Sequence, residues 1–113
     1  MSAGSLGAQA EQRAAQYLQQ QGLKPVAQNY RGRFGEIDLI MQDGATLVFV
    51  EVRLRRSANF GGAAASIDTR KQRRIVRTAQ QYLAGLAHIP PCRFDAVLMD
   101  ASGVQWLKNA FEA

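Results

Sequence analysis

Two segments of the chain place apolar residues at helical spacing. From Ser5 to Gln21 an apolar residue recurs every three or four positions, and Gly22 follows as a C-terminal stop. A second apolar stripe runs through the segment from Ser66 to about Leu86 and consists of Ile75, Ala79, Tyr82, Leu83 and Leu86. Its candidate N-caps are Ser66, Asp68 and Thr69. Each segment is predicted to form a helix that buries one face.

Five further segments have the alternation or the β-branched content of strands. They are Pro25–Tyr30, Glu36–Gln42, Thr46–Arg53, Arg93–Met99 and Val104–Leu107. Arg31-Gly32-Arg33 is turn-like, Asp43-Gly44 is a hairpin signal, and 100–103 is predicted to turn. This order of elements predicts an α/β fold, with a central mixed sheet flanked by helices. We expect residues 1–113 to form a single domain.

The composition restricts the class of protein further. A chain of 113 residues with 47% hydrophobic residues is long enough for one core and too apolar to be disordered. Cys92 is the single cysteine, so a disulfide-stapled secreted fold is excluded. The first residues lack the pattern of a signal peptide, and no apolar run could span a bilayer. We therefore expect a cytoplasmic protein with no membrane partner.

Positive charge is concentrated in one part of the chain. The protein carries a net charge of +5, yet the segment from Arg53 to Arg77 holds eight basic residues and a single acid, Asp68. Arginine binds phosphate through a planar fork of donors, so this segment predicts nucleic acid as partner. A solvated basic face is the alternative, and an anionic membrane surface is a weaker third reading. The candidate nucleic-acid-binding residues are Arg31, Arg33, Arg55, Arg56, Arg70, Arg73, Arg74 and Arg77.

Glu11 and Glu51 are acidic residues on apolar faces. Glu11 lies on or beside the apolar side of the first helix, because Ala14 and Leu18 follow it at i+3 and i+7. A buried carboxylate requires a partner, a metal or a cleft, whereas a residue at the rim would simply reach solvent. Glu51 and Arg53 share a strand face with Phe49, which indicates a strand buried on both sides.

The hairpin relates Asp38 to these residues. Asp38 alternates with the face of Ile37 and Leu39, so a solvated face alone would account for it. A two-residue loop at Asp43-Gly44 would set Asp38 opposite Phe49, with Glu51 as diagonal neighbour, and a four-residue loop would set it opposite Glu51. An odd-length loop would separate them. Either even loop brings the two carboxylates onto one face, where their repulsion favours a shared cation.

Carboxylate oxygens favour Mg²⁺ or Mn²⁺, so Asp38 and Glu51 are the candidate metal ligands. A divalent ion polarises a phosphoryl oxygen and activates water, and a nearby cation offsets the charge that grows on the phosphate. Carboxylates beside a basic segment therefore predict phosphodiester hydrolysis.

Asp38, a gap of twelve residues and Glu51-Val52-Arg53 together resemble the PD-(D/E)xK nuclease signature, with arginine in place of lysine. The surrounding sequence is more specific and resembles the bacterial YraN family over nearly the whole chain. The segments that carry this resemblance are Gly7 to Leu18, Asn29-Tyr30-Arg31, Gly35 to Ile40, Val48 to Val52, Lys71 with Arg74, Ala79 to Leu83, Arg93-Phe94-Asp95 and Asn109-Ala110-Phe111.

That family is regarded as a predicted endonuclease related to archaeal Holliday junction resolvases. The resemblance implies a restriction-endonuclease-like fold with a mixed sheet of four or five strands. It also implies that Glu11 matches the N-terminal helical glutamate of the resolvases, that Asp38 and Glu51 match the metal carboxylates, and that Arg53 stands at the motif lysine. Asp95 is expected to be structural or to form a salt bridge with an arginine.

Arg53 departs from the motif, and the departure leaves several functions open. Arginine stays protonated, so Arg53 cannot act as a base, although it can stabilise phosphate. Lys71 lies at the inward edge of its helix and could replace the lysine, or could be an ordinary boundary lysine. The chain is thus predicted to be a Mg²⁺- or Mn²⁺-dependent endonuclease acting on DNA, with branched DNA as one substrate. The alternatives are a non-catalytic nucleic-acid-binding module and a protein-interaction domain. A symmetric junction substrate would call for a homodimer.

Overall fold

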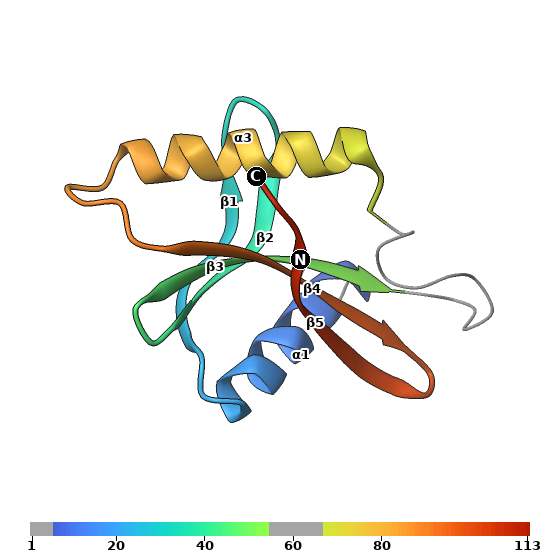
Figure 1. Cartoon of the computed structure of the whole chain (residues 1–113). Helices are drawn as coiled ribbons and strands as arrows, with labels where there is room; N and C mark the ends of the chain where they lie inside the picture. The colour runs from blue at the N-terminus through green and yellow to red at the C-terminus, as the bar shows by residue number, and fades with distance from the viewer. Residues whose placement is uncertain (1–5, 55–66) are drawn as a thin grey trace.

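Five strands form one mixed sheet in which spatial order follows chain order (Figure 1). The computed structural model describes residues 6–54 and 67–113. Its elements are α1 (Leu6–Gln20), β1 (Lys24–Arg31), β2 (Glu36–Asp43), β3 (Thr46–Leu54), α3 (Thr69–Ala84), β4 (Cys92–Asp100) and β5 (Gly103–Phe111). Neighbouring strands are antiparallel except β3 and β4, which are parallel. The predicted α/β class with a mixed sheet is confirmed. The resemblance implied four or five strands, and the sheet has five.

The two described helices pack on opposite faces of this sheet (Figure 1). The α1 face buries alanines and Leu18 of the helix against Leu39, Met41, Val48 and Val97. The α3 face buries Ile75 and Ala79 against Ile40, Phe49, Phe94 and Ala96. Because β2, β3 and β4 are covered on both sides, the side chains in the middle of these strands are buried on both faces. Within the described residues, no helix is long and apolar enough to cross a membrane.

Both predicted helices form, with ends that differ by a few residues. Gly22 has φ 100°, and beside it the Leu23 amide donates to the Leu18 carbonyl at 3.0 Å, so the predicted stop is confirmed. Asp68 is the N-cap of α3, where its Oδ1 accepts from the Lys71 amide at 2.8 Å. The alternative cap Ser66 lies outside the described residues, and α3 ends at Ala84 rather than near Leu86.

The turn between β2 and β3 lies one residue later than predicted. Asp43 pairs with Thr46 as the last ladder pair, so the two turn residues are Gly44 and Ala45. Gly44 has φ 62°, a left-handed value that glycine adopts without steric cost. The shift sets Leu39 opposite Val50, and the ladder ends at this pair, one position before Asp38 and Glu51. The turn has two residues, so its length is even, as one of the predicted alternatives required.

The predicted alternation of β2 is wrong at Ile37. Leu39 and Met41 belong to the α1 cluster as expected, but Ile37 belongs to the α3 cluster together with Ile40. The change of face occurs at Asp38, whose neighbour on β1 is Asn29, a residue with the left-handed φ of 52°. A strand keeps strict alternation only while its backbone stays regular. The departure from alternation in β2 therefore lies at Asp38.

Strand β5 runs four residues beyond the predicted end at Leu107. Asn109 has φ 56°, and its amide donates to Asp95 Oδ1 at 2.9 Å, so the ladder contains an irregular step that hides the alternation. Beyond it Phe111 is buried and stacks on Phe94 with ring centroids 5.1 Å apart. Asp95 is fully buried and accepts two hydrogen bonds from Arg93, which confirms the expected structural salt bridge.

Candidate active site

The described structure brings the five predicted site residues into one cleft. Side chains from four separate elements line a hollow of about 240 Å³. The predicted site residues in its lining are Glu11 from α1, Asp38 from β2, Glu51 and Arg53 from β3, and Lys71 from α3. These residues are far apart in sequence, so the sheet and its two helices together create the cleft.

Asp38 is oriented by the backbone of the neighbouring strand. Its Oδ2 accepts a hydrogen bond from the Val52 amide at 2.8 Å. The described ladder between β2 and β3 ends at Leu39 and Val50, so the carboxylate takes over where backbone pairing stops. The resulting orientation holds Asp38 near the start of β2, in a hollow that residues of both helices also line.

Glu51 is a buried acid among charged groups. Only 4% of it is exposed, and its Oε2 lies 3.0 Å from Lys71 Nζ and 3.7 Å from the Arg53 guanidinium. Burial raises the pKa of the Glu51 carboxyl from 4.5 to about 7, and the charge of Asp38 adds to the rise. The hydrogen bond and charge of Lys71 act in the opposite direction. Lys71 therefore offsets only part of the rise in the pKa of Glu51.

Glu11 completes the acidic side of the cleft. Burial raises the pKa of its carboxyl, and the charge of Asp38 raises it further. The Asn29 side chain hydrogen-bonds to Glu11 and lowers its pKa in partial compensation. Asn29 was not among the predicted site residues, although an Asn within a strand segment is a signal for a left-handed position.

Lys71 reaches inward, as its position on the helix suggested. The alternative of a boundary lysine that extends into water does not describe its 3.0 Å contact with Glu51. The four arginines of α3 are exposed instead, namely Arg70, Arg73, Arg74 and Arg77. Arg74 also lines a second hollow of about 190 Å³, with Gly35, Glu36, Asp38 and Lys71. Asp38 and Lys71 line both hollows, so the arginine face of α3 adjoins the acidic cleft.

The remaining predicted arginines have different surroundings. Arg31 is exposed and forms a salt bridge with Glu36 at 3.1 Å. Arg33 is exposed as well, and its amide donates to Gln81 Oε1 at 2.8 Å. Arg55 and Arg56 lie outside the described residues.

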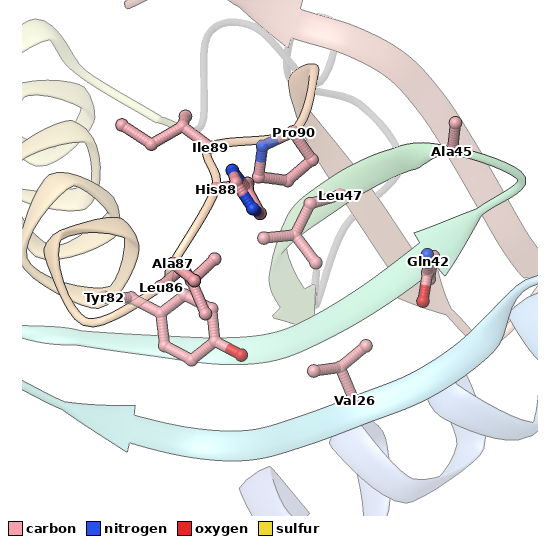
Figure 2. A pocket seen from close by; sticks show the side chains of 10 residues that line it. All are labelled: Val26, Gln42, Ala45, Leu47, Tyr82, Leu86, Ala87, His88, Ile89 and Pro90. Atoms are coloured by element: carbon pink, nitrogen blue, oxygen red, sulfur yellow. The ribbon is translucent and has the colours of Figure 1, made fainter.

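A larger hollow lies elsewhere on the molecule and has a different character. It measures about 390 Å³ and is formed between the end of α3 and the strands around Val26 and Leu47 (Figure 2). Its lining is mostly aliphatic and includes one histidine, His88. Because no carboxylate lines it, this hollow does not offer the chemistry of the acidic cleft.

Comparison with known proteins places these residues in a family. The model of the uncharacterised protein family UPF0102 matches residues 10–99. The chain belongs to this family. A UPF0102 protein of Cupriavidus taiwanensis is 59% identical over 109 residues, which cover 95% of this chain and 82% of the relative. A UPF0102 protein of Nitrosomonas europaea is 57% identical over 114 residues, covering 98% of this chain and 97% of the relative.

A third UPF0102 protein, from Psychromonas ingrahamii, is 51% identical over 113 residues, covering 98% of this chain and 93% of the relative. The YraN-like character inferred from the sequence is thereby confirmed as membership of UPF0102. The matched range includes the five predicted site residues that line the acidic cleft and the four arginines of α3. Both halves of the candidate site thus lie within the part of the chain that defines the family.

The acidic cleft of this UPF0102 protein has a donor set that fits a hard cation. Within the described ranges, no three His, Cys, Asp or Glu side chains form a ready metal cluster. Mg²⁺ does not require one, because it is commonly held by one or two carboxylates and keeps several waters. Asp38 and Glu51 are close enough for each other's charge to matter, as the raised pKa of Glu51 indicates. Two such carboxylates suit Mg²⁺ or Mn²⁺ better than zinc.

Proposed function

We propose that this UPF0102 protein is a metal-dependent phosphodiesterase, an endonuclease that cleaves DNA. The observation that carries the proposal is the convergence of Asp38, Glu51 and Lys71 in one cleft beside an exposed row of arginines. A binding surface for phosphate alone would be weakened by acids at this place, because carboxylates repel phosphate. Acids beside a phosphate-binding face are useful when they hold a cation.

Asp38 and Glu51 are the proposed ligands of Mg²⁺ or Mn²⁺. Such an ion supplies polarisation of a phosphoryl oxygen and activation of a water nucleophile. The Val52 amide holds the Asp38 carboxylate in place, so that part of the site is preorganised. Ionisation of Glu51 is unfavourable without a further cation, since burial and Asp38 both raise its pKa. Binding of a divalent ion would offset both effects.

The cationic side chains have separate proposed roles. Arginine side chains are cations that bind phosphate through a planar fork of donors, and we assign to Arg53 the stabilisation of charge on the phosphate. Lys71 Nζ, at 3.0 Å from Glu51, occupies the place where a lysine can orient water, so we assign it the role of the motif lysine. Glu11, which hydrogen-bonds with Asn29, is proposed to help position that water.

DNA is proposed to follow the arginine face of α3 towards the cleft. Arg70, Arg73 and Arg77 are exposed, and Arg74 lines the hollow that adjoins Asp38. Arg31, Arg33, Arg55 and Arg56 are proposed to extend this surface. The resemblance to resolvases adds three further proposals: a restriction-endonuclease-like fold, branched DNA as a substrate, and a homodimer. The expected site of action is the cytoplasm.

A cleavage assay tests the proposal. End-labelled duplex, single-stranded, flapped and four-way-junction DNA would be incubated with Mg²⁺, with Mn²⁺ or with EDTA. We expect metal-dependent cleavage of at least one substrate, and its loss in Glu51→Gln, which keeps the shape of the side chain but cannot ionise. Glu112→Gln removes an exposed carboxylate outside the cleft and serves as matched control. Absence of cleavage with every metal and substrate would contradict the enzyme assignment.

Two ion pairs of Glu51 favour a second candidate function, a non-catalytic nucleic-acid-binding module. Glu51 already has two cationic neighbours, Lys71 and Arg53, which could replace a metal permanently. In that case the wild type would bind DNA without cleaving it. Arg53→Lys separates the two functions, because lysine restores the motif residue. An enzyme should keep or increase its cleavage rate in this variant, whereas a binding module should remain inactive or show only a trace of activity.

A further inference from the structure

Phe34 is an exposed aromatic residue on a turn with a fixed backbone. It lies between β1 and β2, and 43% of it is exposed. The turn is closed by the Gly32 amide, which donates to the Gly35 carbonyl at 2.8 Å. It is also tied to α3, because the Arg33 amide donates to Gln81 Oε1 at 2.8 Å. The position of the Phe34 backbone is therefore fixed by one hydrogen bond within the turn and one between the turn and α3.

The Phe34 ring is held by an arginine of α3. The Arg77 guanidinium lies 5.5 Å from the ring centroid, within the range of a cation–π contact. Arg77 is itself exposed and shares the outward side of α3 with Arg73 and Arg74. The aromatic ring is thus presented at the edge of the proposed phosphate-binding face, with one side occupied by a cation.

A hollow connects this turn with the acidic cleft. Gly35, the residue after Phe34, lines the hollow of about 190 Å³ that Arg74, Asp38 and Lys71 also line. A strand whose phosphate lay beside Arg74 would have its neighbouring base near the turn. Isolated exposed apolar residues are common and need no function. Phe34 differs because its turn is fixed, its ring contacts Arg77, and the hollow beside the turn is lined by Arg74 and Lys71 as well as by the acids Glu36 and Asp38.

We infer that Phe34 is a stacking platform for an unpaired base, so that the site takes DNA that is single-stranded or locally unpaired. This inference rests on the proposed function and narrows its substrate class. An aromatic face beside a basic groove is the usual arrangement for binding single strands, since every base has a face that can stack. In an intact duplex the bases are already stacked on one another and cannot reach the ring.

Binding measurements in EDTA test this without any cleavage. A labelled single strand, the same strand with abasic spacers, and a blunt duplex would be titrated with the full-length protein. We expect Phe34→Ala to weaken binding of the single strand roughly 5- to 150-fold, the range for loss of one stacked base. Binding of the abasic strand and of the duplex should not change. Phe34→Trp should retain the affinity of the wild type, because indole offers a comparable face.

Ile89→Ala is the matched control, because Ile89 is an exposed apolar residue, 71% exposed, at the distant aliphatic hollow. It should leave all three affinities unchanged. A 2-aminopurine in the single strand should lose fluorescence on binding to the wild type and keep it with Phe34→Ala. Unchanged single-strand affinity in Phe34→Ala, or equal weakening for the normal and abasic strands, would overturn the inference.

Failure of the stacking inference and failure of the proposed nuclease function give different results. If the wild type cleaves DNA with Mg²⁺ but Phe34→Ala binds single strands as tightly as the wild type, the stacking platform is refuted and the nuclease stands. If stacking on Phe34 is observed and no metal supports cleavage, the nuclease is refuted and the platform stands.

Discussion

The ionisation of Glu51 makes the stability of this protein depend on pH in an unusual direction. Burial and the charge of Asp38 raise its pKa from 4.5 to about 7 in the folded state. Between these two values the folded protein holds a proton that the unfolded chain has released. The free energy of unfolding must therefore fall as the pH rises through this range. Most acids in proteins have the opposite effect, because their pKa values are lowered by folding.

The size of the effect follows from the same shift. Each pH unit corresponds to 1.36 kcal/mol, so a rise from 4.5 to about 7 amounts to roughly 3 kcal/mol. Glu51→Gln removes this contribution, because glutamine does not titrate. We expect the stability of the variant relative to the wild type to increase by roughly 3 kcal/mol between about pH 4.5 and about pH 8. Any constant cost of the glutamine cancels in this comparison.

Urea unfolding of both proteins in EDTA at the two pH values measures the difference directly. Glu112→Gln, which removes an exposed carboxylate, should show no such change with pH. In a separate series without EDTA, Mn²⁺ added near pH 8 should stabilise the wild type and not Glu51→Gln, since a ligand that binds only the folded state raises its stability. If Glu51→Gln instead becomes less stable relative to the wild type as the pH rises, the Glu51–Lys71 pair is a stabilising salt bridge and the reasoning is refuted.

Other predictions follow from neighbouring groups. Calorimetry should detect Mn²⁺ binding that weakens at least about tenfold in Glu51→Ala, because a ligand is lost; equal binding would refute the metal assignment. Replacement of Arg70 and Arg73 by alanine should make the slope of log affinity for DNA against log salt concentration shallower by about two units, because two phosphate contacts are lost. An unchanged slope would place the DNA elsewhere. Lys71→Ala should lower turnover with little change in DNA affinity; loss of affinity alone would contradict its assigned role. Asp95→Asn should destabilise the protein by roughly 2–4 kcal/mol, since the buried carboxylate loses its charged and polar partners. The fluorescence spectrum of Trp106, whose Nε1 donates to Asp95 Oδ2, should shift as well. Wild-type stability of the variant would contradict the structural role of Asp95.

The relation between Asp38 and Glu51 was predictable because it depends on parity. Residues on a strand alternate between faces, so every even-length hairpin loop leaves both acids on one side. The exact turn was not predictable, because Gly44 can serve in either of two adjacent turn positions. The observed turn at Gly44-Ala45 shifts the register and leaves the parity unchanged. The wrong position of the predicted turn therefore leaves unchanged the prediction that both acids lie on one face.

Irregular backbone positions account for what the sequence patterns missed. The change of face at Ile37 and the continuation of β5 to Phe111 both involve an Asn with positive φ, Asn29 in the first case and Asn109 in the second. Asn109 lies within β5 itself, whereas Asn29 lies on β1, beside the part of β2 that holds Ile37. Alternation assumes regular strands, so an irregular residue in a strand or in its neighbour makes the pattern misleading close to it. The contact of Arg77 with Phe34 joins residues from a turn and a helix and has no signature in either segment.

The sequence by itself determined the elements, the α/β class and the faces on which most residues lie, because these depend on spacing within a few residues. It also indicated that Lys71 lies at the inward edge of its helix. Only the tertiary structure decided that Lys71 meets Glu51, that Asn29 hydrogen-bonds with Glu11, and that both acids share a cleft with Asp38. These contacts join α1, three strands and α3 across long stretches of chain. Their geometry, and the raised pKa of Glu51 that results, comes from how the two helices pack on the opposite faces of one sheet.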